Sequence, residues 1–305
     1  MIELNKKKEN LYYNDYDIPI KNNIKNYYKQ PPKANIKKKR KLKLWVWIVI
    51  FIILITITII SITKIILWSK NNLDTNNIIE KTNTNYELVE DNKNTEYINK
   101  PTNENDDYYY YIKFPLINVN FTELLKKNSD TIAWINVNNT NINYPIVQTT
   151  NNNYYLNHSF NKKQNDAGWV FMDYRNNKNF DNKNTIIYAH NRLNKTMFGS
   201  LSEALKESWY KNKDNHIIRI STPTENTSWQ IFSVYKIKTE TYYITTDFTN
   251  EEYEQFLTTI KNRSKYNFNT NLSANDQIIT LSTCYSNSEK TVVHAKLIKK
   301  ETREN

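Results

Sequence analysis

The only cysteine of this 305-residue chain, Cys284, and one of its four histidines, His190, both follow short apolar runs. Cys284 comes after QIITLST and His190 after TIIYA, so each is expected where a β-strand ends, a place that commonly carries catalytic groups. A thiol reacts as its thiolate, and a nearby imidazole can take the thiol proton. The pair therefore predicts nucleophilic catalysis by cysteine.

The count of one cysteine excludes an intramolecular disulfide, and an unpaired cysteine in an exported protein is a candidate reactive thiol. The alternative is that Cys284 is a small buried hydrophobic residue. His294 lies inside the expected strand VVHAKL and is interpreted as structural, and His158 and His216 are interpreted as loop residues. No histidine has metal-ligand spacing with another ligand, and two glycines cannot make a Gly-rich phosphate loop, so no metal or cofactor is expected.

The apolar patterns predict many short strands and two helices. The helices are expected over residues 121–135 and 249–263, the second with a Thr or Asn cap and acids in its first turn. The strands are expected over residues 142–148, 168–172, 185–188, 217–220, 229–237, 277–282 and 291–298. This number of strands predicts a mainly β domain, either a barrel or a sandwich.

Composition divides the chain into four parts. Residues 1–43 contain 13 Lys or Arg against four acids, so +9 of the total charge of +11 lies in this tail and nucleic acid is not expected as a partner of the folded part. Residues 44–63 are uncharged and, as a helix, rise about 30 Å, which matches the hydrocarbon core of a membrane. Residues 64–107 are rich in Asn, Thr and acids and predict a spacer, and a globular domain is expected over residues 108–305.

The apolar run is expected to be an uncleaved anchor in the lipid of the cell membrane. A cleaved signal peptide is the alternative, but no small-residue cleavage pattern follows the run. Six basic residues just before it, against Lys64 and Lys70 after it, predict a cytoplasmic amino terminus and an extracellular domain.

The residues around Cys284 and His190 resemble those of a known family. TLSTC at residues 280–284 is similar to the TLxTC signature of sortases, which ends in the nucleophile. NTIIYAHN at residues 184–191 and TMFGSL at residues 196–201 resemble the sortase segment that bears the catalytic histidine. INYPIVQ, WVFMDYRN and the helix before QIITLSTC resemble class B sortases, and the matches cover roughly residues 115–300.

The resemblance implies an eight-stranded β-barrel with an amino-terminal helix, a long helix between strands six and seven, and a membrane anchor. It also implies a cysteine transpeptidase of the thiol protease type (EC 3.4.22), typical of Gram-positive cell surfaces. Cys284 would attack the Thr carbonyl in a carboxyl-terminal sorting signal similar to NP(Q/K)T(N/G/S) of an exported protein, and His190 would transfer protons. An amine of a peptidoglycan cross-bridge or stem peptide would then release the thioacyl enzyme, which anchors the protein to the cell wall.

The same resemblance implies six positions that bind the sorting signal, although each of them could be a packing residue instead. They are Asn143, Val147, Thr239, Tyr243, Ile244 and Ser282.

The chain departs from the family at one catalytic position. Sortases have an Arg two residues before a segment like VVxAK, and this chain has Lys290 there. An Arg donates to an oxyanion as a fixed fork, whereas Lys is a single mobile charge. Lys290 is therefore either the working cation or a solvated hairpin residue, and Arg192, just after His190, is another candidate for the cation.

Two alternative functions follow. The chain could be a pilin-polymerising sortase, whose acceptor is a Lys of another subunit. It could also be a weakened sortase-like module that binds peptides with little turnover, because the usual Arg is Lys290.

Overall fold

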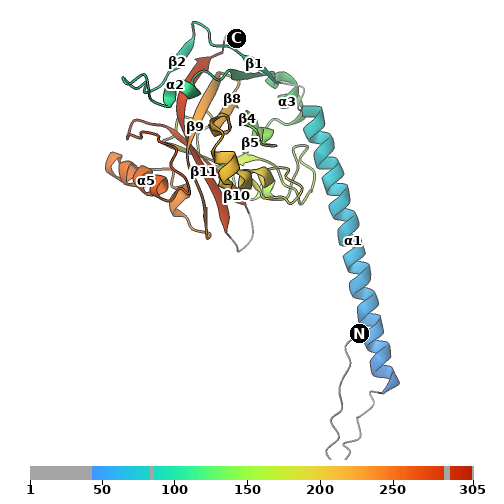
Figure 1. Ribbon diagram of the computed structural model, residues 1–305. Helices are drawn as coiled ribbons and strands as arrows, with labels where there is room; N and C mark the ends of the chain where they lie inside the picture. Colours follow the sequence, from blue (N-terminus) through green and yellow to red (C-terminus); the bar gives the residue numbers. More distant parts are fainter. Residues whose placement is uncertain (1–42, 83–85, 285–288, 304–305) are drawn as a thin grey trace, which may run out of the picture. The chain divides into compact units, whose positions relative to one another are not determined.

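A computed structural model describes residues 43–82, 86–284 and 289–303 (Figure 1). The chain divides into two compact units, Met1–Thr56 and Ile57–Asn305. The predicted cytoplasmic tail, apart from Lys43, lies outside the described residues. Helix α1 (Leu44–Thr82) begins with the apolar run, is long and apolar enough to cross a membrane, and has no buried residue in its apolar window. It continues well past the predicted span of residues 44–63.

Eight strands of the second unit form a closed barrel, in agreement with the expected fold. Their order around the barrel is β10, β7, β6, β5, β4, β8, β9 and β11, and pairing of β11 with β10 closes it. The strands are β4 (Thr131–Val137), β5 (Asn143–Val147), β6 (Phe171–Met172), β7 (Asn184–His190), β8 (Ile217–Ser221), β9 (Glu225–Ile237), β10 (Ile278–Cys284) and β11 (Lys290–Thr302). Short helices between them are η2 (Tyr154–Leu156), η3 (Gly199–Leu205), α4 (Glu207–Tyr210), η4 (Lys213–His216) and η5 (Tyr242–Ile244).

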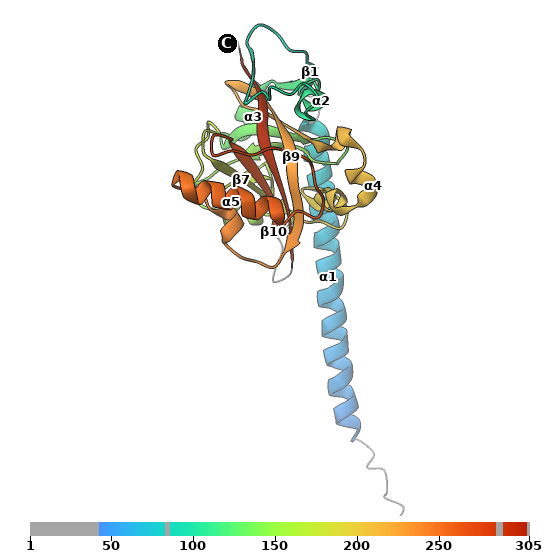
Figure 2. The ribbon, with the colours of Figure 1, turned by 60° about the vertical axis from the view of Figure 1, so that its left-hand side comes forward.

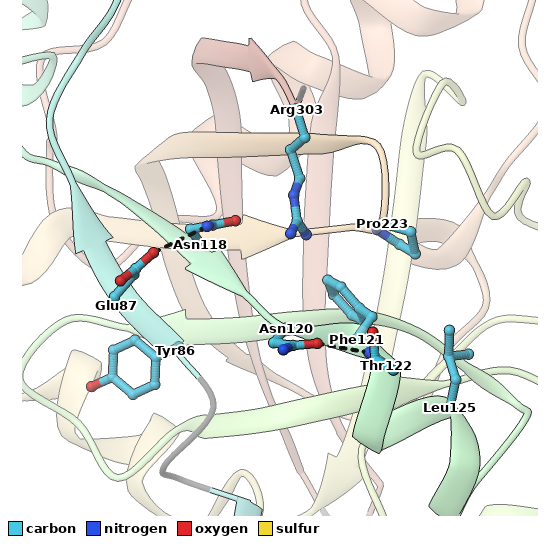
Figure 3. Close-up of a pocket in the computed structure, with 9 residues that line it drawn as sticks. All are labelled: Tyr86, Glu87, Asn118, Asn120, Phe121, Thr122, Leu125, Pro223 and Arg303. Carbon is cyan, nitrogen blue, oxygen red and sulfur yellow. Dashed lines mark hydrogen bonds between the residues drawn. The ribbon is translucent and has the colours of Figure 1, made fainter. Parts of the chain in front are cut away.

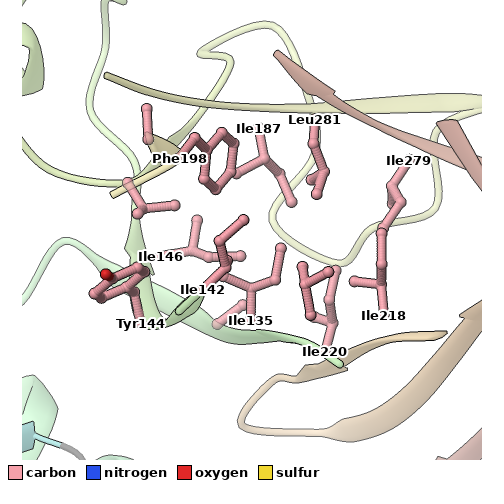
Figure 4. Close-up of a cluster of buried hydrophobic side chains, with 14 of the residues drawn as sticks. Ile135, Ile142, Tyr144, Ile146, Ile187, Phe198, Ile218, Ile220, Ile279 and Leu281 are labelled. Carbon is pink, nitrogen blue, oxygen red and sulfur yellow. The ribbon is translucent and has the colours of Figure 1, made fainter. Parts of the chain in front are cut away.

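The barrel interior is filled by alternate residues of its strands. Ile187 of β7 and Ile279 and Leu281 of β10 point into a cluster that Figure 4 shows together with Ile146 and Ile218. All five side chains are fully buried, and each such burial contributes about 1.5–3 kcal/mol relative to exposure. Because strand side chains alternate, the residues between them face the outside of the barrel.

Helix α5 (Asn250–Asn262) lies between β9 and β10, the sixth and seventh barrel strands, as expected (Figure 2). Thr249 caps it by accepting a hydrogen bond from the backbone N–H of Glu252, whose side chain accepts one from Thr249 in return. Its apolar face packs on outward-facing Phe232 of β9 and Ile278 of β10. The helix thus covers the outer surface of the strand that ends at Cys284.

The predicted helix over residues 121–135 is wrong in its second half. Helix α3 (Phe121–Lys127) ends at Asn128, whose backbone is extended and whose side chain donates to Tyr155 Oη at 2.8 Å. Residues from Thr131 onward form β4, a strand between β5 and β8 with nearly every position buried. A strand buried on both faces has no alternating pattern, so its apolar residues also fit helical spacing.

Part of the predicted spacer, residues 64–107, forms regular structure in the second unit. Strand β1 (Tyr86–Val89) pairs with β3 (Leu116–Val119), and β2 (Thr95–Tyr97) pairs with the outer end of β11. A short helix, α2 (Tyr108–Tyr111), follows. Short edge strands depend on backbone hydrogen bonds more than on apolar side chains, which explains why the composition predicted only a spacer.

Candidate active site

Cys284 and His190 are the last residues of two adjacent strands. Strands β10 and β7 run parallel through seven consecutive pairs, and the last pair is Cys284 with His190. Neighbouring strands lie about 4.8 Å apart, and paired residues of parallel strands belong to the same face. The fold therefore brings the two predicted catalytic residues to adjacent positions.

His190 belongs to the outer face of the barrel. Ile187 and Leu281 point into the core, so Tyr188 and Ser282, one residue on, belong to the outer row. His190 is the next member of that row in β7, and Cys284 pairs with it at the end of β10. The candidate site is therefore at the ends of these two strands.

The imidazole of His190 is oriented by a backbone carbonyl. Its Nε2 lies 2.6 Å from the carbonyl oxygen of Leu156, which can only accept a hydrogen bond, so Nε2 carries the proton. The ring is partly buried. With Nε2 committed to Leu156, proton exchange with a thiol would use Nδ1.

Both glycines of the chain lie against the segment that begins with His190. A Cβ on Gly168 would be 2.9 Å from His190 Cδ2 and 2.6 Å from the Tyr155 carbonyl oxygen, and its φ of +59° disfavours side chains. A Cβ on Gly199 would be 2.2 Å from the carbonyl oxygen of Arg192. Only glycine fits at either position, and nothing in the sequence pattern indicated this.

Lys290 begins β11 and lies on the strand next to Cys284. The antiparallel register of β10 and β11 ends at the pair Ser282 with Val292, and Cys284 and Lys290 each lie two residues beyond that pair. The backbone N–H of Thr291 donates to Thr283 Oγ1 at 2.9 Å, which holds the two strands together at this point.

The other candidate cation, Arg192, is directed elsewhere. One of its terminal nitrogens donates to Asn72 Oδ1 on helix α1. Of the two positions considered, Lys290 is the one on the strand that pairs with the strand of the cysteine.

The structure brings several of the predicted substrate-binding residues together on the outer face. Tyr243 Oη lies 3.0 Å from Ser282 Oγ, and Ile244 packs on the cluster formed by Tyr243, Tyr235 and Val292. This cluster makes one wall beside the strand that leads to Cys284.

The remaining predicted substrate-binding residues lie outside this cluster. Val147 belongs to a continuous row of paired residues that crosses Phe171 and Tyr188 to Ser282. Asn143 lies at the start of β5, where its Oδ1 accepts a hydrogen bond from Trp134 Nε1 at 2.7 Å. Thr239 is exposed on the segment between β9 and η5.

A buried polar group supports this face, and sequence reasoning missed it. Asp173 accepts hydrogen bonds from Tyr188 Oη at 2.9 Å and from two nitrogens of Arg175 at 2.7 and 2.9 Å. Burial alone would raise the pKa of Asp173, but these hydrogen bonds outweigh it and hold the pKa below its usual value. Arg175 also donates to the carbonyl of Ile244 at 3.0 Å, so the network ties the wall to the barrel.

A larger pocket, of about 670 Å³, lies away from these residues (Figure 3). It is lined by parts of β1, β3 and α3 and by Arg303, whose guanidinium lies 5.5 Å from the ring centre of Phe121. None of its lining residues was predicted for the site. Among the residues that the structure describes, no group of three His, Cys, Asp or Glu is arranged to hold a metal ion.

Comparison with known proteins matches this geometry. The sortase domain model matches residues 135–298, which include both strand ends and Lys290. The chain belongs to the sortase family. Sortase B of Staphylococcus aureus is 41% identical over 184 residues, which are 59% of this chain and 75% of that protein. Sortase B of Listeria monocytogenes is 37% identical over 187 residues, 58% of this chain and 74% of that protein.

Solved structures agree with the class. Sortase B of Bacillus anthracis in complex with AAEK1 is 32% identical, with a TM-score of 0.60, covering 75% of this chain and 99% of that one. A Staphylococcus aureus sortase B–substrate complex is 38% identical, with a TM-score of 0.56, covering 59% of this chain and 84% of that one. This sortase is thus a class B member, and as a sortase it is a cysteine transpeptidase.

Proposed function

We propose that this sortase cleaves a carboxyl-terminal sorting signal similar to NPQTN after its Thr and transfers the exported protein to a cell-wall peptide amine. Cys284 is the nucleophile, His190 the proton-transfer group and Lys290 the cation beside them. The observation that supports this proposal is the strand register, which pairs Cys284 with His190, while Lys290 begins the strand on the other side of β10.

The reaction has two balanced steps. The Cys284 thiolate attacks the Thr carbonyl, the Thr–Asn peptide bond breaks, and His190 protonates the leaving amine. The acceptor amine then attacks the thioacyl carbon, the C–S bond breaks, and His190 returns the amine proton to the departing thiolate. Lys290 stabilises the oxyanion that forms in both steps.

We further propose that residues 44–63 anchor the enzyme in the cell membrane, with the basic tail of residues 1–43 in the cytoplasm and the domain of residues 108–305 outside. The uncharged start of α1 and the excess of basic residues before it support this topology.

The direct test is to trap the intermediate. The full-length chain in detergent micelles is incubated with an NPQTN peptide, and intact mass spectrometry measures the thioacyl adduct on Cys284. Addition of triglycine should convert the adduct into a Thr–glycine product, and Cys284→Ala should form neither. Absence of adduct and product across a peptide library varied around NPQTN would contradict the proposal.

The Lys position separates an active enzyme from a weakened binding module, the second candidate, which the replacement of Arg by Lys favours. If Lys290 is the working cation, Lys290→Ala should lower turnover by about 10²–10³-fold, equivalent to about 3–4 kcal/mol of barrier. Lys290→Arg should stay within about tenfold of the wild type. A wild-type enzyme with almost no turnover that Lys290→Arg activates strongly would instead support the binding module.

The identity of the acceptor distinguishes a cell-wall enzyme from a pilin polymerase. Transfer to small peptide amines supports the first. Transfer only to a Lys side chain of a protein subunit would support the second.

A further inference from the structure

A cleft of about 370 Å³ opens beside His190, between helix α1 and the segment that follows the histidine. His190 itself lines it, and the other lining residues are Trp68, Asp166, Asn191, Arg192, Leu193 and Asn194. His190 is the last residue of β7, which pairs with β10 on one side and with β6 on the other. Gly168 lies in the segment just before β6. Asp166 precedes Gly168 by two residues, so the cleft is on the β6 side of His190 and Cys284 is on the β10 side.

The cleft is built by specific contacts between α1 and the domain. Asn72 accepts hydrogen bonds from Arg192 and, at 3.4 Å, from Asn194. Asn165 Nδ2 donates to the Asn71 carbonyl at 3.2 Å and lies 3.3 Å from Thr75 Oγ1. The helix that follows the apolar run therefore forms a wall of the cleft.

The charges in the cleft suit a particular ligand. Within the described residues, Asp166 is exposed and forms no hydrogen bond or salt bridge that would neutralise it. Arg192 is close enough to interact electrostatically with Asp166, and its Nε is enclosed without a hydrogen-bond acceptor. A carboxylate attracts an ammonium group and a guanidinium attracts a carboxylate, so the lining suits a molecule that carries both.

We propose that this cleft is the entry site of the acceptor, with Asp166 holding its amine beside His190 and Arg192 holding a carboxylate close to that amine. This rests on the proposed transpeptidation. The second step needs an amine next to the group that takes its proton, and the cleft is lined by that group. The bound ammonium first loses one proton to solvent, and the neutral amine then moves past His190 and attacks the thioacyl carbon. The C–S bond breaks as the second proton of the amine passes through His190 to the Cys284 sulfur. The Trp68 and Leu193 side chains add apolar surface to the lining of the cleft.

The test compares aminolysis with hydrolysis of the same thioacyl enzyme. Full-length wild type and Asp166→Asn react with an NPQTN peptide in the presence of glycine or glycinamide, and mass spectrometry quantifies adduct, Thr–amine product and hydrolysed product. Asp166→Asn should form the adduct within about twofold of the wild-type rate but have an aminolysis-to-hydrolysis ratio about tenfold lower. Glu254→Gln, an exposed carboxylate change on α5, should leave the ratio unchanged.

Arg192 is tested through acceptor choice. Arg192→Gln should lower the preference for glycine over glycinamide by about fivefold, because these acceptors differ in the carboxylate. Asn72→Ala removes the contact of Arg192 with α1 but keeps the charge of Arg192, so this variant should still prefer glycine over glycinamide. The comparison therefore separates loss of the Arg192 charge from loss of its contact with the helix.

The outcomes distinguish the two proposals. If no variant and no wild-type enzyme forms an adduct, the proposed function fails. If the adduct forms and Asp166→Asn partitions between amine and water as the wild type does, the cleft is not the acceptor site and only this inference is overturned.

Discussion

The proposed proton-transfer residue, His190, is positioned by groups that do no chemistry themselves. Its Nε2 is held by the Leu156 carbonyl, and the face of its ring near Cδ2 lies against Gly168. A backbone carbonyl thus does what a side-chain amide or carboxylate does in other Cys–His enzymes, since it fixes the tautomer and the ring plane. In the proposed mechanism, this contact leaves Nδ1 as the nitrogen that exchanges protons.

Gly168→Ala tests this arrangement. The new Cβ would collide with the Tyr155 carbonyl and with His190, so the imidazole should shift and turnover should fall at least tenfold, mainly in kcat. The positive φ should also cost about 1–3 kcal/mol of stability, measured by urea unfolding of the full-length chain in micelles. Asn269→Ala, at another position with positive φ, is the matched control for strain and should lose stability without losing turnover. Wild-type turnover in folded Gly168→Ala would show that the glycine does not position His190.

The sequence predicted the residues of the candidate site around Cys284 and His190, but it did not predict the contacts that position them. The TLSTC run and the histidine after TIIYA predicted two strand ends, and the structure pairs these ends on adjacent strands. The Leu156 carbonyl and Gly168 were not predictable, because a backbone acceptor has no residue-type signal and one glycine in a loop has many explanations. Asp173 and Arg175 stand within the WVFMDYRN match, yet their role became visible only through the hydrogen bonds to Tyr188 and Ile244.

At the scale of elements, the parallel pairing of β7 with β10 creates the site. These strands are separated by about 90 residues, and their apolar runs predicted two strands but not that they are neighbours. Long-range pairing is decided by the whole set of buried faces, which a local pattern does not contain. Helix α5 was predictable almost to the residue, because a cap, acidic first turn and apolar stripe all agree there.

Strand β4 shows where local patterns fail. The strand pairs with β5 on one edge and β8 on the other, and its residues are buried on both faces. Its apolar residues therefore do not alternate with polar ones. Because this stretch follows helix α3 closely, the sequence pattern extended the predicted helix into it. The error did not reach the site, since β4 holds none of the predicted catalytic residues.

At the scale of the whole molecule, two buried histidines link the stability of the second unit to pH. His294 in β11 lies 2.8 Å from both Thr280 Oγ1 and Tyr235 Oη, and His216 lies 2.8 Å from Tyr111 Oη and from the Tyr210 carbonyl oxygen. Burial lowers the pKa of His294 to about 3 and that of His216 to about 4, against 6.5 for the unperturbed side chain. Both are therefore neutral when folded at neutral pH.

The sign of the effect follows from proton binding. Between about pH 4 and pH 6.5 the unfolded chain binds protons at these histidines and the folded chain does not, so the free energy of unfolding rises with pH. The contribution of the two neutral histidines to the free energy of unfolding should be fully present above pH 6.5. From pH 7 to pH 5 the free energy of unfolding should fall by about 2 kcal/mol per histidine, or about 4 kcal/mol in total. Asp173 adds little in this window because its unfolded value, 3.8, lies below it.

The measurement is the urea midpoint of the full-length chain in micelles between pH 4.5 and 7.5. His294→Gln removes one titrating group, so the slope of the free energy of unfolding against pH should fall by about half, even if the variant is less stable throughout. A midpoint that stays constant from pH 7 to pH 5 in the wild type would mean that the barrel admits the charged histidines, for instance by opening around His294. In that case β10 and β11 would pack less closely in solution than their register implies.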